Sequence, residues 1–497
     1  MKLHPRLKAP LALFICLFFV PILGLLTARY MANELEGQFH DSIVFTQRLL
    51  SDEDYKQRQL SYASVCSKME AAGATAETKA VCSPADEVAL VDLSSWTLGA
   101  LGISILFLIY GARWFTGTNR ARLSWTFGLV VRAVMLLLAI AVLGQAALFV
   151  FSVYTLESTA IHRVHGVLLG TIAVAAIAAC WSLLRFTFGL FKSQPMLVKA
   201  IALSRDEQPE LYAFVDDIAN RLNAQSPKNI IAGIEPNFFV TASPINLFGH
   251  DRTLTNETLF ISLAMMRLFD KREFAAVVGH ELGHFRGDDT TYSMRFAPTY
   301  ARLGKAWTAM SVQSGGAADI ARLPAMVMLG TCWNVFASAE RTIGRERELL
   351  ADKAGAEASD SPSLARALVK ISTHAVQWGH LTRAHIDQLA EGRTFTNLST
   401  TFEDGCRTAL GAMDWKAARD ALGSSTQAHP VDTHPPLSQR LDNLGTSLDE
   451  LDVSDIALPV EASIELVRLP EEIEKQLSVL EAQWLVAIRA VVVPQTE

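Results

Sequence analysis

The chain is 497 residues long, which is enough for two or three domains. Half of its residues are hydrophobic and its mean hydropathy is +0.23, which is high for a purely soluble protein. With a net charge of −7 and no basic patch interleaved with aromatic residues, nucleic-acid binding has little support. The sequence also has no Gly-rich phosphate loop, which argues against ATP-driven chemistry by this chain alone.

Hydrophobic residues gather in four stretches of the first 191 residues. Each stretch approaches or exceeds the ~20 apolar residues that a helix needs to cross a bilayer. A buried core helix is the alternative for the weakest of them. We therefore expect an α-helical membrane domain with about four transmembrane helices. The stretches are 11–26, 98–110, 127–151 and 166–191.

Lys and Arg mark one side of this predicted membrane domain. Cytoplasmic loops are enriched in these residues, so the basic segments should lie inside the cell, as should the chain after residue 192. The loops 29–93 and 157–165 should face outward. If the first stretch is instead a cleaved signal peptide, the sidedness of the later segments is unchanged. The basic residues are Lys2, Arg6, Lys8, Arg113, Arg120, Arg122, Lys192 and Lys199.

Two of the six cysteines, Cys66 and Cys82, share the predicted outward loop. They would close a short ring, and an oxidising compartment permits a disulfide there. Two unpaired thiols are the alternative. The remaining four cysteines have no C-x-x-C spacing, so they are poor candidates for metal or redox sites.

The chain after residue 193 alternates between helical and strand-like patterns. Apolar residues recur at helical spacing in 210–223, short strands are expected in 229–242, and 258–262 is a short apolar strand. Helices should then begin near Ala264 and Lys271. This order predicts a mostly α, α+β domain in which a small sheet precedes a long helix.

The helix that begins near Lys271 contains the pattern H-E-x-x-H at residues 280–284. Residues i and i+4 lie on one face of a helix, so His280 and His284 can direct two imidazoles at one zinc ion. Glu281 follows the first histidine and can accept a proton from a water molecule there. Two surface histidines are the alternative, and the apolar residues on one side of the motif argue against it.

A third metal ligand must come from elsewhere in the chain. The extended pattern H-E-x-x-H-x-x-G-x-x-H fails, because Thr290 occupies its last position. Glu348 and Asp352 are i and i+4 on a strong helix former, so Glu348 can bind the metal while Asp352 orients a ligand histidine. Glu346 points away from Glu348 on the same helix. An ordinary charged helix is the alternative.

Three motifs together resemble one known family. H-E-L-G-H at 280–284 is followed by E-L-L-A-D at 348–352 and by T-H-P-P-L-S-Q-R at 433–440. The combination resembles the HtpX-like and CAAX-prenyl-endopeptidase family of membrane zinc metallopeptidases over about residues 195–450. The resemblance implies a zincin-like domain with two histidines and a glutamate on one zinc ion per chain.

Three further residues receive a role only from this resemblance. His434 would lie near the metal, as a fourth ligand in a resting state or as a donor to the transition-state oxyanion. A plain His-Pro turn is the alternative. Arg440 would brace the region of Asp352, and Asp289 matches an acidic position common after the family's histidine motif.

The sequence departs from the family pattern in the strand before the motif helix. Many members carry an Asn-Ala pair there, whereas this chain has P-N-F-F-V-T at 236–241. That strand is expected to hold an extended substrate by strand addition. We therefore expect Phe238 and Phe239 to change the shape of the cleft, and not the zinc chemistry.

The expected organisation has three parts. Residues 1–192 form the membrane domain, 193–450 the metallopeptidase domain, and 451–497 a helical extension that packs or, less simply, makes an oligomer contact. Residues 323–337 are apolar but short for a span. An amphipathic helix bundle at the membrane or over the cleft is favoured there over a hairpin of spans.

Together these patterns predict an integral membrane zinc endopeptidase. Its partners would be polypeptide substrates, membrane or misfolded proteins by the resemblance, and the lipid bilayer, with no nucleic acid. A bacterial inner membrane and a cytoplasmic peptidase domain fit best. The alternatives are a processing peptidase of narrow specificity and a zinc-binding membrane scaffold or chaperone without cleavage; the oligomeric state is left open.

Overall fold

The computed structural model describes most of the chain, and its residues divide into two compact units, here called the helical unit and the mixed unit. The helical unit comprises Met1–Gly117, Trp125–Lys192 and Thr299–Ala337. The mixed unit comprises Thr118–Ser124, Ser193–Pro298 and Ser338–Glu497. The described residues are 5–47, 61–71, 73, 75–158, 163–190, 195–286, 296–311, 317–424, 435–488 and 490.

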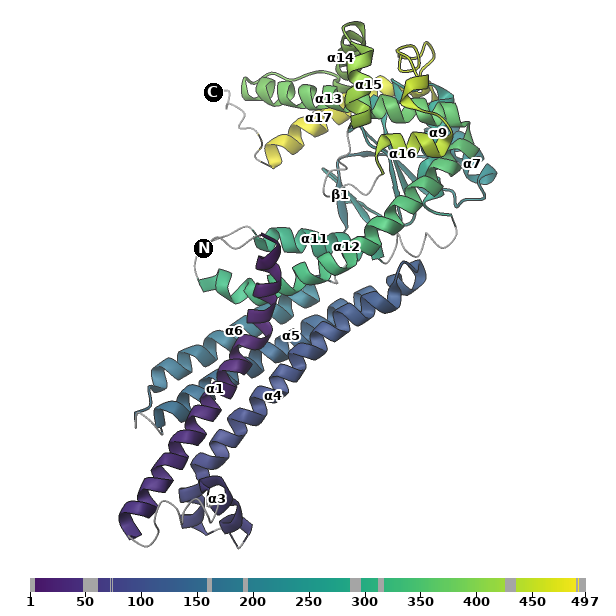
Figure 1. Ribbon diagram of the computed structural model, residues 1–497. Coiled ribbons are helices and arrows are strands. Elements are labelled where there is room, and N and C mark those ends of the chain that lie inside the picture. Colours follow the sequence, from purple (N-terminus) through teal and green to yellow (C-terminus); the bar gives the residue numbers. More distant parts are fainter. Residues whose placement is uncertain are drawn as a thin grey trace. The chain divides into compact units, whose positions relative to one another are not determined.

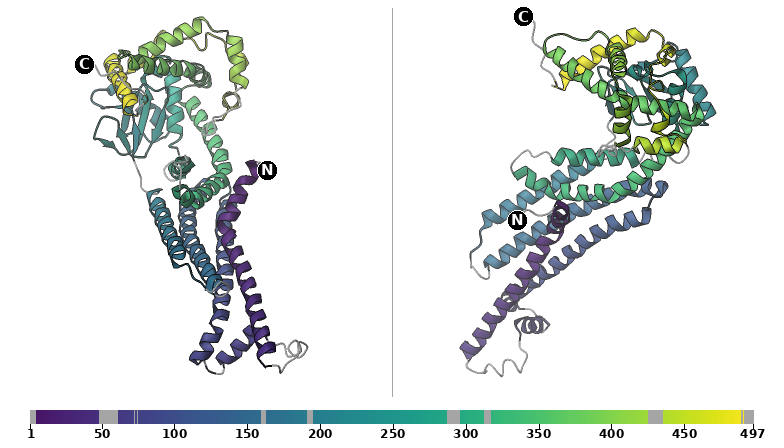
Figure 2. Two further views of the ribbon diagram at one scale, coloured as in Figure 1. Left: turned by 90° about the vertical axis from the view of Figure 1, so that its left-hand side faces the viewer. Right: turned by 45° about the horizontal axis from the view of Figure 1, so that its top comes forward.

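Long apolar helices build the helical unit (Figures 1 and 2). Three of them are long and apolar enough to cross a membrane, and α6 is apolar over a shorter described stretch, Gly166–Trp181. The expected α-helical membrane domain is thereby confirmed, with three clear candidate spans and one shorter apolar helix. The helices are α1 (Pro5–Gln47), α4 (Ala76–Thr116), α5 (Arg120–Leu156) and α6 (Gly166–Leu190).

A disulfide joins the short helix α3 (Tyr62–Ala71) to the start of α4. It links Cys66 to Cys82, whose Cα atoms lie 5.5 Å apart. Both side chains are buried, and the Tyr62 hydroxyl donates to the Val81 carbonyl at 2.5 Å beside them. The disulfide therefore links α3 covalently to α4, in the segment that is predicted to face outward.

The segment 323–337 lies inside the 42-residue α12 (Ala317–Ala358), which packs beside α11 (Ala297–Ser311). The Tyr300 ring stacks on Trp333 at 4.1 Å, and Phe336 meets Phe127 of α5 edge-on at 5.0 Å. Residues 323–337 are thus one part of a long helix, and its aromatic rings pack against α11 and α5.

Two small sheets lie at the centre of the mixed unit. In the first, parallel β3 and β7 occupy the middle and antiparallel β2 and β4 the edges, in the order β2-β3-β7-β4. The second has the order β1-β5-β6. The strands are β1 (Met196–Val198), β2 (Ile201–Leu203), β3 (Asn229–Gly233), β4 (Phe239–Thr241), β5 (Ile245–Leu247), β6 (Thr253–Leu254) and β7 (Thr258–Ser262).

Helices pack on the four-stranded sheet and enclose the main core. The β3 and β7 strands are buried almost throughout, because helices cover them, as is usual for parallel strands. Covering and flanking helices are α7 (Pro209–Arg221), α8 (Leu263–Met266), α9 (Lys271–Gly283), α13 (Ser361–Ala390), α14 (Leu398–Gly411), α15 (Trp415–Ser424) and α16 (Leu437–Leu444).

The C-terminal residues contribute to that same core. Two 3-10 turns, η3 (Leu448–Glu450) and η4 (Ser463–Leu466), lead to helix α17 (Pro470–Ala487). Leu477 and Leu480 of α17 are buried in the main core. Glu474, on the same face, is fully buried and binds Arg267 through two hydrogen bonds of 2.7 Å. The tail thus packs within the mixed unit, as its apolar stripe predicts.

One buried histidine of α13 should make stability depend on pH. Burial, with the nearby Lys370 charge, lowers the pKa of His374 from 6.5 to about 4. The unfolded chain therefore binds a proton that the folded chain excludes. The free energy of unfolding should fall as pH drops below about 6.5, by roughly 2 kcal/mol between pH 7 and pH 5.

The test compares chemical unfolding of the full chain in detergent at both pH values. His374→Leu should remove this part of the pH dependence, whereas His380→Leu, at an exposed position of the same helix, should retain it. Equal pH dependence in the wild type and both variants would show that His374 is not the group responsible.

Candidate metal centre

The motif helix α9 begins at a double cap. Asp270 accepts hydrogen bonds from the amides of Arg272 and Glu273, at 2.8 and 2.7 Å, and the Glu273 carboxylate accepts one from the Asp270 amide. Such a capping box satisfies the otherwise unpaired amides at a helix start. The buried Lys370 of α13 binds the same Glu273 carboxylate at 2.8 Å. The helix carrying the histidines is therefore anchored at its first turn.

Small residues let α9 and α12 approach closely. A Cβ atom at Gly279 would collide with Ala358, and one at Gly283 would lie 2.8 Å from the Ala354 Cβ. On α12, a Cβ at Gly355 would lie 2.6 Å from the Ala276 carbonyl oxygen. Only residues without a side chain fit at these positions. The close contact brings the histidine face of α9 against the carboxylates of α12.

Three side chains converge between the two helices. The Nε2 atoms of His280 and His284 lie 3.5 and 3.4 Å from different oxygens of Glu348, and one ligating atom of each residue lies within 4.8 Å of the others. Ligands placed tetrahedrally at 2.0–2.1 Å from zinc would be about 3.3–3.4 Å apart. The donor set and its spacing therefore fit a zinc ion, and the two imidazole rings are nearly perpendicular, at 87°.

Asp352 and Arg440 support the first histidine from behind. The fully buried Asp352 lies 2.9 Å from His280 Nδ1, and Arg440 of α16 binds both Asp352 oxygens, at 3.0 and 2.5 Å. An ionised carboxylate only accepts hydrogen bonds, so Nδ1 of His280 carries the proton. Its Nε2 atom is then directed towards His284 and Glu348, where it can bind a metal once it has lost its proton.

The carboxylates around His280 favour the charged form of its ring. Burial disfavours its charged form, but hydrogen bonds to Asp352 and Glu348 outweigh burial and raise the pKa of His280 to about 9. Burial likewise acts against Asp352, yet hydrogen bonds from His280 and Arg440 lower the pKa of that carboxyl. Because metal binds neutral imidazole, a cation entering this site must displace a proton.

Other predicted site residues fall in different places. Glu281 follows His280 on α9, half-buried, and its charge acts on the Arg440 guanidinium. Arg440 itself lies where the family resemblance implies, beside Asp352. Asp289 and His434 lie outside the described residues.

Phe238 lies just before β4, and Phe239 is the first residue of that strand. Phe238 is buried and packs against Phe269 and Phe274, and Phe239 stacks on Phe260 at 4.8 Å. Consecutive strand residues point to opposite faces of a sheet, so each ring enters a different hydrophobic core. Both rings therefore contribute to the hydrophobic cores on the two faces of the sheet, and their effect on the cleft stays a prediction.

Sequence reasoning missed the residues that set the distance between the helices. Gly279 and Gly283 are four residues apart on the motif helix, and Gly355 lies among alanines at 351–358. This spacing of small residues on two helices was a usable signal for close packing. Lys370 was also missed, because no local pattern links it to Glu273, 97 residues away.

Comparison with known proteins gives consistent matches to about half of the chain. The model of peptidase family M48 matches residues 205–447. The Archaeoglobus fulgidus "Protease HtpX homolog" is 27% identical over 242 residues, covering 48% of this chain and 67% of the relative. The Streptomyces coelicolor "Protease HtpX homolog 1" is 29% identical over 259 residues, covering 50% and 74%. No solved structure matches.

Proposed function

Since this chain is an M48-type membrane metalloendopeptidase similar to the HtpX proteases, we propose that its metal is zinc, held by His280, His284 and Glu348. The observation that carries the proposal is the convergence of these three ligating atoms between α9 and α12. Two imidazoles and one carboxylate are the donor set of a catalytic zinc site that keeps one position open. We expect one ion per chain.

The chain's own residues then divide the chemistry among them. When bound, zinc would polarise a peptide carbonyl and lower the pKa of water. Glu281, one residue after the first ligand, acts as general base towards a water molecule and then passes the proton to the leaving amine. Asp352 holds the His280 ring, and Arg440 holds Asp352.

Two residues outside the described part keep the roles that the family resemblance implies. His434 would act as a fourth ligand in a resting state or as a donor to the oxyanion. Asp289 would be the acidic residue common after the family's histidine motif, in support of the metal ligands. The free edge of β4, which pairs only with β7 among the described strands, would hold an extended polypeptide by strand addition.

We further propose membrane or misfolded proteins as substrates and the cytoplasm as the location of the peptidase domain, 193–450, with 451–497 as its helical extension. The distribution of Lys and Arg supports this sidedness. The disulfide between Cys66 and Cys82 supports it as well, because disulfides persist in oxidising compartments outside the cytoplasm. A bacterial inner membrane has a reducing cytoplasm on one side and an oxidising compartment on the other, as this arrangement requires.

The function is tested by metal content and cleavage together. The full chain, purified in detergent, should contain about one zinc ion and cleave unfolded casein, lose cleavage to a zinc chelator and regain it with zinc. Glu348→Gln should lose metal and cleavage, whereas Glu346→Gln, at an exposed position of α12, should keep both. A wild-type chain that cleaves at full rate after complete metal removal would contradict the proposal.

Asp352→Asn provides a separate measure of how the ligands are supported. The amide cannot replace the carboxylate that holds both His280 and Arg440, so zinc affinity should fall about 10–100-fold. Competition with a chromophoric chelator measures the change. Glu357→Gln, at an exposed position of the same helix, is the matched control. Unchanged zinc affinity in Asp352→Asn would refute the supporting role.

A further inference from the structure

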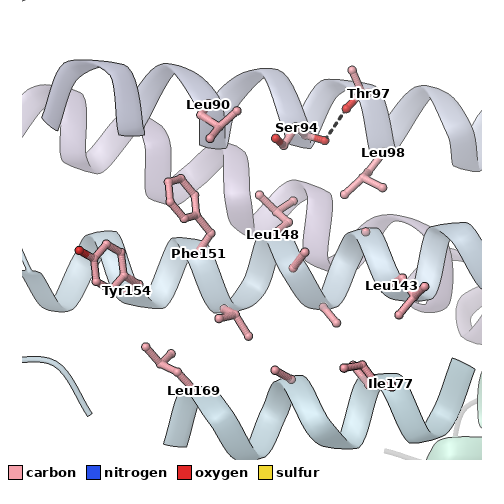
Figure 3. A pocket seen from close by; sticks show the side chains of 16 residues that line it. Leu90, Ser94, Thr97, Leu98, Leu143, Leu148, Phe151, Tyr154, Leu169 and Ile177 are labelled. Atoms are coloured by element: carbon pink, nitrogen blue, oxygen red, sulfur yellow. Dashed lines mark hydrogen bonds between the residues drawn. The ribbon is translucent and has the colours of Figure 1, made fainter. Parts of the chain in front are cut away.

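A cavity of about 810 Å³ lies between α4, α5 and α6 in the helical unit (Figure 3). Leu98 and Phe151 project into the space between α4 and α5, and Ile177 of α6 closes the opposite side. Several lining side chains are also exposed at the edge of the helix bundle, including Leu90 at 51% and Ile177 at 63%. The cavity is therefore open towards the surroundings of the helices.

The lining selects a hydrocarbon occupant. Most of the 16 lining residues are apolar, and the Thr97 hydroxyl donates to the Ser94 carbonyl within α4 at 2.9 Å. That hydroxyl therefore needs no partner from a ligand. Apolar cavities are not filled by ordered water, because a water molecule needs two to four polar partners. Because the lining belongs to two candidate membrane spans, α4 and α5, and to the apolar helix α6, the available hydrocarbon is that of the bilayer.

The size of the cavity separates a lipid chain from a transmembrane helix. The lining runs along α5 from Leu143 to Tyr154, about 16 Å at 1.5 Å per residue. The hydrocarbon core of a bilayer is about 30 Å thick, so a transmembrane helix would need a groove about twice as long as this one. The acyl chains of a lipid occupy one leaflet, which is about half of that thickness, and the cavity has this length.

One end of the cavity lies near an arginine, beside a carboxylate that already has partners. Tyr154 lines the cavity and shares a helix face with Glu157, three residues later. The Glu157 carboxylate is bound by the amide and ring of His165, both at 2.8 Å, and the Arg163 amide donates to the Glu157 carbonyl at 3.2 Å. The exposed Arg163 therefore lies at the Tyr154 end, where a lipid phosphate would emerge.

We propose that this cavity is a binding site for one membrane phospholipid. Its acyl chains lie between α4, α5 and α6, and its phosphate lies near Arg163. An arginine binds a phosphate by charge-assisted hydrogen bonds, so Arg163 suits the headgroup. The apolar lining keeps water away from the acyl chains, so it suits the tails. The bound lipid would be a structural part of the helical unit, and its binding would not depend on the zinc chemistry.

The test is photo-crosslinking of the full chain in phosphatidylglycerol vesicles. A small fraction of the lipid carries a diazirine in its acyl chain, and the labelled peptides are identified by mass spectrometry. We expect labelling concentrated on 143–154 and 169–177 and competed by unlabelled phosphatidylglycerol in a saturable way. Uniform labelling of all spans, without saturation, would mean ordinary bilayer contact and overturn the site.

Matched variants on α6 make the result specific. Ala176→Phe places a ring inside the cavity and should reduce the concentrated labelling roughly tenfold. Ala175→Phe adds the same ring at an exposed position outside the lining and should leave it unchanged. Arg163→Gln should reduce lipid retained after detergent washing. Equal labelling of both alanine variants would overturn the proposal. If Ala176→Phe does not fold, competition by unlabelled lipid in the wild type tests the site instead, and labelling that does not saturate would overturn it.

Discussion

Replacing Glu281 with Gln should reduce casein cleavage by roughly 10²–10⁴-fold, the usual contribution of a general base, while zinc content stays at that of the wild type. The amide has nearly the shape of the carboxylate but cannot accept a proton. Because Glu281 is not one of the three converging ligands, the metal should remain. Metal analysis and cleavage rates on the same preparations measure both quantities.

The control for this prediction is Glu346→Gln, which makes the same chemical change at an exposed position. It should cleave as the wild type does. If both wild type and Glu281→Gln bind zinc and neither cleaves casein, narrow specificity or a scaffold role would replace the general endopeptidase. If Glu281→Gln retains full activity, another group must be the base.

Gly279→Leu should abolish both metal binding and cleavage, and destabilise the mixed unit by about 3 kcal/mol or more. A side chain at this position would occupy the space of Ala358 and lie against the backbone of α12. The helices would have to separate, and Glu348 would then move out of reach of His280 and His284. Thermal unfolding and zinc content of the purified chain test the two effects.

A matched glycine separates this packing effect from helix propensity. Gly379 lies on α13, and a Cβ there would meet nothing within 4 Å. Gly379→Leu should therefore keep metal and activity, and its higher helix propensity should leave stability unchanged or slightly raised. A Gly279→Leu variant with normal zinc content and thermal stability would show that α9 and α12 tolerate a wider spacing.

Features that depend on short stretches of sequence could be predicted well. The spacing H-E-x-x-H puts both histidines on one helical face, and E-x-x-x-D does the same for Glu348 and Asp352, because the helix repeat is 3.6 residues. The apolar stretches likewise indicated membrane helices from their length alone. The apolar stretch 166–191 matches α6 closely, whereas the full length of α12 was not predictable, because Pro324 lies inside that helix.

Features that depend on packing between distant segments were not predictable. The alternation of a strand places Phe238 and Phe239 on opposite faces, but only the folded sheet shows that both faces are hydrophobic cores. Similarly, Lys370 and Glu273 are ordinary charged residues until α13 buries them together at 2.8 Å. Such a pair has no local signature, because its partners are chosen by the fold.

The sequence by itself determined which residues can bind a metal, which can act as a base, and which segments can cross a membrane. Each of these follows from residue chemistry and a local repeat. Only the tertiary structure decided the distance between α9 and α12, which Gly279, Gly283 and Gly355 set by lacking side chains. That distance brings His280, His284 and Glu348 together, because a metal site needs several ligands within a few ångströms and one helix supplies only two.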